Sequence, residues 1–253
     1  RILAKVRPDL VVIDAYIGSP ALIKSDLPFI VIYSAAPLML FNCDNLPPPW
    51  SGLPSLSTKS NTILQPESKY LNIYMYPKEL DYNEWQPLPH NWKRVDGFVR
   101  TTGHTFAVPD RLTQRPGKLI LLSMGSIGCA LLELMIRLTS ILAKSEHKFI
   151  VTKGPLHDEY ELPDNMYGQP FLPQTAVLPL VDLVITHGGN NTVTEAFYYG
   201  KPLLAIAHMF EQTGMTMETM DRVKVEVCKR CDSCCRAIDL IEKTVDDDKE
   251  TTN

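Results

Sequence analysis

Polar side chains that can bind a sugar and a diphosphate gather in one stretch of the sequence, residues 181–212. His187, Asn191, Thr192 and Glu195 lie within a glycine turn and the first two turns of the helix expected after it. The N–H groups and the positive dipole end of a helix N-terminus favour phosphate, and the polar side chains around it are suited to sugar hydroxyls. The stretch therefore predicts a site for a sugar joined to a diphosphate.

The elements that must hold these side chains are a strand, a tight turn and a helix. Residues 181–186, VDLVIT, form a mostly apolar run rich in β-branched residues, which is typical of a strand buried on both faces of a parallel sheet. Residues 187–189 allow a tight bend, and residues 190–199 predict a helix that ends at Gly200. The helix N-terminus is thereby expected at the carboxyl edge of the sheet, where ligands of such folds bind.

A second strand follows, and it brings further polar residues to the same edge. Residues 203–207 predict this strand, and Glu211 and Gln212 come after it. An alternative without a ligand exists for part of the pattern. Thr192 and Glu195 have the spacing of a capping box, in which both side chains would be occupied by backbone N–H groups.

Four segments within about 40 residues form one motif: Phe171-Leu172-Pro173-Gln174, THGGNNTVTE at 186–195, Gly200-Lys201-Pro202 and Glu211-Gln212. Their order, spacing and residue types resemble the donor-binding signature of the UDP-glycosyltransferases, the family 1 enzymes with two facing Rossmann-like domains. The resemblance extends outward to LILLSMGSIG at 119–128 and to residues 8–34.

The resemblance implies an α/β, GT-B-like fold whose first domain is incomplete. A polar, proline-punctuated passage at 97–117 places the boundary near residue 105. We expect the C-terminal half of an acceptor-binding domain at 1–105, a donor-binding domain at 106–212, and a divergent Cys-rich and acidic tail at 213–253. Within these domains the patterns predict strands at 10–14, 28–34, 119–123 and 147–152 and helices at 19–24 and 130–144.

The family's chemistry is transfer of a hexose or hexuronic acid from a UDP-sugar to a hydroxyl of a small lipophilic acceptor, with inversion and without a metal. Two residues depart from the family pattern. Phe171 stands where a tryptophan usually stacks on uracil, and Glu211 replaces the usual aspartate. The resemblance assigns the donor contacts to Ser126, Phe171, Gln174, His187, Gly189, Asn191, Thr192, Glu195, Glu211 and Gln212.

Asp14 is the candidate for catalysis, because it ends the strand at 10–14. In the family this carboxylate orients a histidine that takes the acceptor's proton. The alternative is an aspartate that only closes a turn. No histidine precedes Asp14, so we expect the base, and about 100 residues of the domain, to lie outside the chain. The chain alone is then nearly inactive, and a non-catalytic UDP-sugar-binding module is the alternative function.

Composition limits the other classes of function. The chain has 253 residues, 45% of them hydrophobic and 21% charged, with a formal net charge of −4. This is a globular composition, and without a basic block we expect no nucleic-acid partner. No apolar run approaches ~20 residues, so no transmembrane span is expected. We expect a cytoplasmic protein, or an endoplasmic-reticulum protein if its termini are missing, and the oligomeric state stays open.

The cysteines raise the one competing site. Cys228, Cys231, Cys234 and Cys235 have ligand-like spacing for zinc or an iron-sulfur cluster. Four thiolates so close together would form a cramped site, and the long interval between ligand pairs is missing. We therefore expect no metal and no cofactor, with the UDP-sugar as donor substrate.

Overall fold

The structure, a computed structural model, describes residues 2–14, 19–25, 27–34, 67–75, 88–95, 99, 102–206 and the backbone of 226–227. Glu211, Gln212 and the four clustered cysteines lie outside these residues. The chain divides into two compact units, Arg1–Phe98 and Val99–Asn253. Within the described part, no helix has the length and apolar character needed to cross a membrane.

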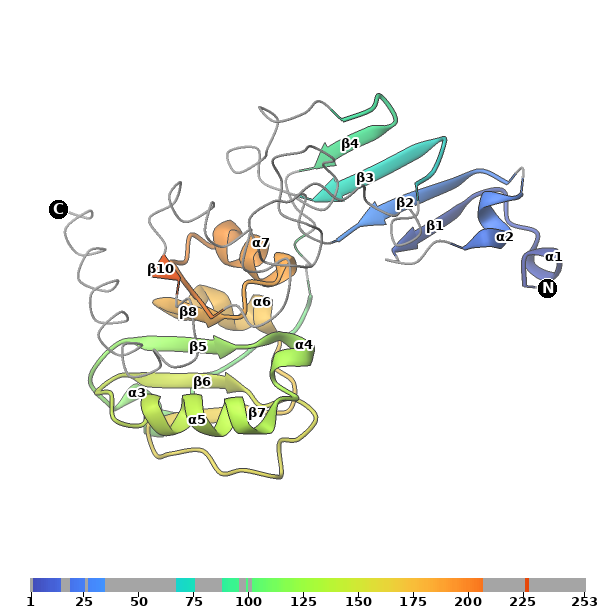
Figure 1. Cartoon of the computed structure of the whole chain (residues 1–253). Helices are drawn as coiled ribbons and strands as arrows, with labels where there is room; N and C mark the ends of the chain where they lie inside the picture. Colours follow the sequence, from blue (N-terminus) through green and yellow to red (C-terminus); the bar gives the residue numbers. More distant parts are fainter. Residues whose placement is uncertain are drawn as a thin grey trace, which may run out of the picture. The chain divides into compact units, whose positions relative to one another are not determined.

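The described strands of the first unit form a parallel four-stranded sheet in the order β1-β2-β3-β4 (Figure 1). The predicted strand, helix and strand at its start are confirmed. No strand was predicted at β3 or β4. The elements are α1 Ile2–Val6, β1 Val11–Asp14, α2 Pro20–Ile23, β2 Phe29–Tyr33, β3 Leu71–Met75 and β4 Trp92–Val95.

A small core supports this sheet. Phe29 and Val31 of β2 are buried together with Leu22 of α2, and Val11 and Ile13 of β1 pack against them. Burial alternates along β2, as expected for a strand with one face on a core. Because β1 pairs with β2 in parallel, its last residue, Asp14, lies at the carboxyl edge of the sheet.

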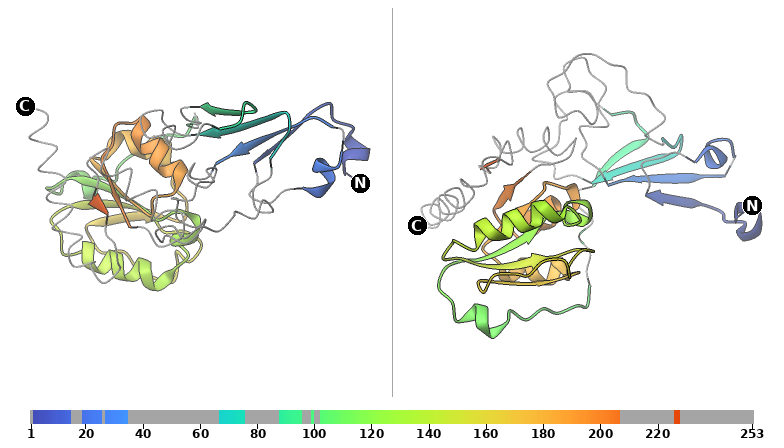
Figure 2. Two further views of the ribbon diagram at one scale, coloured as in Figure 1. Left: turned by 45° about the horizontal axis from the view of Figure 1, so that its top comes forward. Right: turned by 60° about the horizontal axis from the view of Figure 1, so that its bottom comes forward.

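The described strands of the second unit form a parallel six-stranded sheet in the order β10-β9-β8-β5-β6-β7 (Figures 1 and 2). This is the doubly wound order, which reverses direction between β5 and β8, so the predicted α/β, Rossmann-like fold is confirmed. The elements are α3 Asp110–Thr113, β5 Leu119–Ser123, α4 Gly125–Gly128, α5 Leu132–Leu142, β6 Lys148–Thr152, β7 Met166–Gln169, α6 Gln174–Val177, the 3-10 helix Leu178–Leu180, β8 Leu183–Thr186, α7 Asn190–Tyr198, β9 Leu203–Ala205 and β10 Glu226–Val227.

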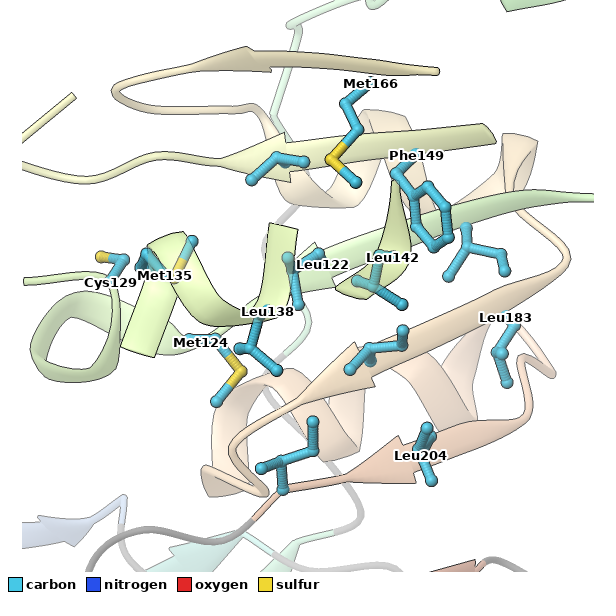
Figure 3. Close-up of a cluster of buried hydrophobic side chains, with 14 of the residues drawn as sticks. Leu122, Met124, Cys129, Met135, Leu138, Leu142, Phe149, Met166, Leu183 and Leu204 are labelled. Atoms are coloured by element: carbon cyan, nitrogen blue, oxygen red, sulfur yellow. The ribbon is translucent and has the colours of Figure 1, made fainter. Parts of the chain in front are cut away.

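The main core of this unit lies between the sheet and α5. Figure 3 shows Leu138 and Leu142 of α5 against strand residues such as Leu122 and Phe149, all of them buried. Successive residues of a strand point to opposite faces, so Leu121 and its alternates face away from α5. In the left view of Figure 2, α7 lies on this opposite side of the sheet.

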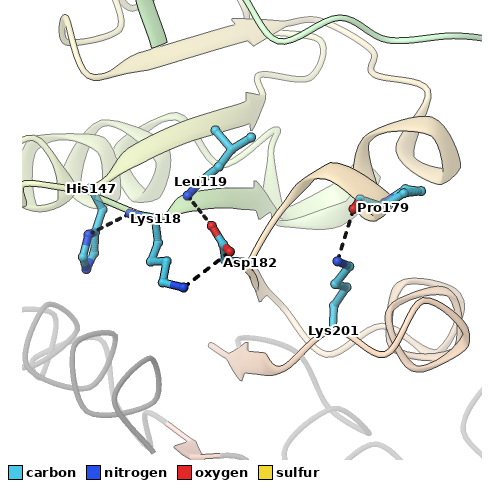
Figure 4. A network of polar contacts seen from close by, with 6 residues as sticks. All are labelled: Lys118, Leu119, His147, Pro179, Asp182 and Lys201. Carbon is cyan, nitrogen blue, oxygen red and sulfur yellow. Dashed lines mark hydrogen bonds and ion pairs between the residues drawn. The ribbon is translucent and has the colours of Figure 1, made fainter. Parts of the chain in front are cut away.

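The two central strands are fixed to each other at their amino ends (Figure 4). Asp182 Oδ2 accepts a hydrogen bond of 2.8 Å from the Leu119 N–H, and Lys118 Nζ lies 3.6 Å from Asp182 Oδ1. A separate bond, from Lys201 Nζ to the Pro179 carbonyl at 3.2 Å, joins the segment before β9 to the 3-10 helix before β8. Since β5 and β8 are held in register here, their carboxyl ends finish level with each other.

Several predicted boundaries differ from the structure by one or two residues; the predicted helix 130–144, for example, is α5, Leu132–Leu142. The segment predicted as a glycine loop, 124–128, contains the short helix α4, a single turn that begins at Gly125, with one residue between it and the end of β5. The predicted helix 190–199 ends one residue earlier, at Tyr198. Its end is a Schellman motif, because Gly200 has φ +62°, its N–H donates to Phe197, and the Lys201 N–H donates to Ala196.

Candidate functional site

The candidate site lies at the carboxyl ends of β5 and β8, where the strand order reverses. Ser123 and Thr186 are the last paired residues of the two strands. The chain leaves β5 into residues 124–128 and leaves β8 into residues 187–189. The structure therefore places both predicted loops at the topological switch point, the position at which doubly wound sheets bind ligands.

His187 brings these two loops into direct contact. A β-carbon added at Gly125 would lie 2.4 Å from His187 Cε1, and one added at Gly189 would lie 2.3 Å from His187 Nε2. Gly125 also has φ +68°, which disfavours other residues. The imidazole thus fills the space of two missing side chains, while its Nδ1 lies 3.2 Å from the Thr186 hydroxyl.

The N-terminus of α7 follows the second loop. The helix begins at Asn190 after Gly189, and no side chain caps it. The capping-box alternative is therefore wrong, because Thr192 and Glu195 lie inside the helix. The first N–H groups of a helix lack partners within it. With no capping side chain, this N-terminus is suited to an anion.

A partly buried polar bridge connects β5, α6 and α7 through Gln174. Ser123 Oγ donates to Gln174 Oε1 at 2.8 Å. Gln174 Nε2 donates to Glu195 Oε2 at 2.6 Å and to Thr192 Oγ1 at 3.3 Å. Ser123 is 3% exposed and Glu195 is 4% exposed. The structure thus brings three predicted residues together, and it gives the Gln174 amide internal partners that the sequence did not predict.

The remaining predicted donor residues differ in exposure. Ser126 lies within the first loop and Asn191 follows the second, and both are exposed. Phe171 is 69% exposed and lies between β7 and α6, three residues before Gln174. An exposed aromatic ring retains a face on which a base can stack.

The support beneath the Ser126 loop is uncharged at neutral pH. The Cys129 thiol donates to the Ser126 carbonyl at 3.6 Å, and burial raises its pKa above the usual value of 9.0. Burial, followed by the nearby Cys129, raises the pKa of Tyr160 to about 12. No negative charge from the Cys129 thiol or the Tyr160 phenol is therefore present near the loop at neutral pH, where it would repel an anionic ligand.

In the first unit, Asp14 is exposed at the end of β1. Ser34, which follows β2, donates its hydroxyl to Asp14 Oδ1 at 2.9 Å. A carboxylate offers about four lone-pair sites, so this bond leaves capacity for a further donor. An N–H group such as that of an imidazole is suited to this place.

Two functional candidates were missed from the sequence, Ser123 and Ser34. Each is a polar residue at or just after the end of a mostly apolar strand, and the rule that singled out Asp14 applies to them equally. No three His, Cys, Asp or Glu side chains of the described ranges gather as a possible metal ligand set.

Comparisons with known proteins identify the family of the second unit. Residues 120–247, just over half of the chain, match the model of the glycosyltransferase family 28 C-terminal domain. Zeaxanthin glucosyltransferase of Pantoea ananas is 49% identical over 45 residues, which is 18% of this chain and 10% of that protein. Mouse UDP-glucuronosyltransferase 3A2 is 37% identical over 70 residues, which is 27% of this chain and 13% of that protein. The matched segments thus span only a small part of these relatives.

The fold has known counterparts over nearly the whole chain. The spinosyn forosaminyltransferase SpnP superposes with a TM-score of 0.66 at 19% identity. The superposition covers 97% of this chain and 69% of that one. At this identity the likeness concerns the fold, which is that of the GT-B glycosyltransferases.

Proposed function

The chain belongs to the family of the glycosyltransferase family 28 C-terminal domain, and from this premise we propose that it takes part in sugar transfer from a UDP-sugar to a hydroxyl of a small lipophilic acceptor. The observation that carries the proposal is the pair of loops at the ends of β5 and β8, joined by His187 beside an uncapped helix. Names of similar proteins, mouse UDP-glucuronosyltransferase 3A2 among them, favour UDP as the nucleotide and a hexose or hexuronic acid as the sugar.

The proposed reaction is a single displacement at the anomeric carbon. The acceptor oxygen forms a bond to this carbon as the bond to the β-phosphate oxygen breaks. The electron pair leaves with UDP, and the hydroxyl proton passes to a base. Attack on the side opposite the leaving group inverts the anomeric centre.

The diphosphate is assigned to the two loops and the start of α7. His187, the Ser126 loop, and the backbone N–H groups of Asn191 and Thr192 are the proposed donors, and Gly189 lets the ligand approach the backbone. Thr192 contributes its N–H, because its hydroxyl accepts from Gln174. Donors fixed before the reaction stabilise the charge that develops on departing UDP.

The nucleoside and the sugar are assigned to the residues around this loop pair. Glu195 is proposed to accept from the ribose hydroxyls, and the exposed ring of Phe171 to stack on uracil, beside Gln174. Glu211 and Gln212 are proposed to bind the sugar hydroxyls, by the family resemblance.

Asp14 is proposed to hold the base that takes the acceptor proton. Ser34 fixes one of its oxygens and leaves acceptor capacity for an imidazole N–H. The test uses a form of the protein that transfers glucose or glucuronic acid to a phenol. In it, Asp14→Asn is expected to lower turnover about 10²-fold or more, because a positioned base contributes that much. UDP affinity should not change, and unaltered turnover would remove this role.

No metal is assigned to the reaction. The helix N–H groups already place partial positive charge at the proposed diphosphate position, and the His187 ring can add an N–H donor. We therefore expect UDP affinity to be the same in EDTA and in added magnesium.

Calorimetric titration of the chain with UDP and with UMP tests the donor site. We expect UDP to bind about tenfold more tightly or better, because only UDP places a second phosphate against the loops. Equal affinities would contradict the assignment of the diphosphate to His187 and α7.

A further inference from the structure

We infer that Ser123 is a positioning residue of the donor site, which acts through Gln174 to orient the carboxylate of Glu195 toward the ribose. The inference rests on the proposed function. It adds a residue that touches no part of the ligand. Its basis is the bridge from the end of β5 to the second turn of α7.

The bridge selects one of the two orientations of the Gln174 amide. An amide oxygen only accepts, and an amide nitrogen only donates. Ser123 donates to Oε1, while Glu195 accepts from Nε2 at 2.6 Å. In the reversed orientation two oxygens, Gln174 Oε1 and Glu195 Oε2, would face each other. The Glu195 carboxylate, which can only accept, therefore sets this orientation, and the Ser123 hydroxyl donates to Oε1 and holds the amide in its place.

Burial makes this choice energetically important. Ser123 and Glu195 are both almost completely removed from water. Gln174 between them is only partly buried, so water can replace part of a lost bond, but the loss of one bond still weakens the rest of the network. Without the Ser123 hydroxyl, Gln174 Oε1 loses its donor, and the amide is held less firmly in the position from which its nitrogen reaches Glu195.

Ser123 also supplies the rigid end of the bridge. Gln174 begins the short helix α6, whereas Ser123 ends β5, which is paired on both sides in the centre of the sheet. Through Gln174, the position of the Glu195 carboxylate is thus fixed relative to the sheet. A neighbouring hydroxyl provides the contrast, because Thr194 Oγ1 is buried on the same helix without a hydrogen-bond partner.

The test compares Ser123→Ala with Thr194→Val, which removes a buried hydroxyl that has no partner. Each protein is titrated with UDP and with 2′,3′-dideoxy-UDP, which lacks the ribose hydroxyls. For Ser123→Ala we expect the Kd of UDP to rise about 5- to 10-fold and that of dideoxy-UDP to change less than about twofold. Thr194→Val should leave both values unchanged.

A double-mutant cycle separates positioning from packing. In a Glu195→Gln background, Ser123→Ala should weaken UDP binding less than about twofold, since the carboxylate that it positions is gone. Equal losses of UDP and dideoxy-UDP, or additive losses in the cycle, would show that Ser123 serves packing only and overturn the inference. Normal UDP affinity in Ser123→Ala would overturn it as well. If the chain without any substitution binds no UDP, the proposed function is overturned, and this inference with it.

Discussion

The imidazole of His187 occupies the volume that β-carbons would need at Gly125 and Gly189. The ring can take this position because both residues are glycines and have no side chain. A small change at Gly125 should therefore act on the ligand through His187, without touching the ligand itself.

Gly125→Ala is expected to raise the Kd of UDP at least about tenfold, because the new methyl group would overlap the His187 ring at 2.4 Å and the backbone at φ +68° disfavours alanine. Gly103→Ala is the matched control, since a β-carbon there meets nothing within 4 Å. Calorimetry measures both. If the two variants bind UDP equally well, His187 is not held by Gly125 in the way described.

The phenol of Tyr160 predicts a stability change at alkaline pH. Its pKa is raised from 10.0 to about 12 in the folded chain, so the folded state holds the proton more tightly than the unfolded state. Its contribution to stability is present below pH 10 and is lost between pH 10 and 12, by about 1 to 3 kcal/mol. Cys129, whose pKa is also raised, adds a loss that begins near its ordinary value of 9.0.

Tyr160→Phe should make the free energy of unfolding less dependent on pH between 10 and 12, when measured by urea denaturation at each pH. Below pH 10 the variant should be at least as stable, because the Tyr160 hydroxyl is buried without a hydrogen-bond partner. The ring and its contact with Lys153 remain. An unchanged pH profile would contradict the raised pKa.

At the scale of elements, α5 is held to the sheet by one apolar face. Leu138 is 1% exposed against the core, whereas Ile136 on the same helix is 41% exposed. Leu138→Ala is expected to lower the free energy of unfolding by about 2 to 5 kcal/mol, through lost burial and a residual cavity. Ile136→Ala should cost less than about 1 kcal/mol. Chemical denaturation compares the two, and similar losses would contradict the packing of α5.

The elements that the sequence predicted correctly are those whose pattern is local. β5, β6 and β8 are short apolar runs buried in the sheet, and α5 has a regular apolar face. β3 was missed because it contains Asn72, which is polar but buried. In the structure both ends of the Asn72 amide bond to the backbone of Ser68 at 2.7 Å. Such a bond between a strand and the segment before it leaves no periodic signal.

The same distinction between local patterns and contacts distant in sequence holds for the site. Residues that belong to the strand ends and the glycine turn were found, because their place follows from a parallel sheet. The Ser123 to Gln174 to Glu195 bridge was not, because it joins residues 51 and 21 positions apart that come together only in the folded unit. The capping-box alternative was wrong because spacing alone does not show where the helix begins.

At the scale of the whole chain, the described strands build two parallel sheets, each with a functional candidate at its carboxyl edge. The first unit presents Asp14, and the second presents the loops after β5 and β8. One sheet is thus suited to hold a base and the other to hold a diphosphate. The geometry is more complete in the second unit, and the central claim is that its sheet edge between β5 and β8 binds the diphosphate.

A structure of the chain determined at saturating UDP tests this claim most directly. We expect the diphosphate at the carboxyl edge between β5 and β8, within hydrogen-bonding distance of His187, of the Ser126 loop and of the Asn191 N–H. The ribose hydroxyls should lie against Glu195, with Gln174 still bridging it to Ser123. A diphosphate bound at any other surface of the chain, or UDP that leaves this edge empty at saturation, would contradict the account.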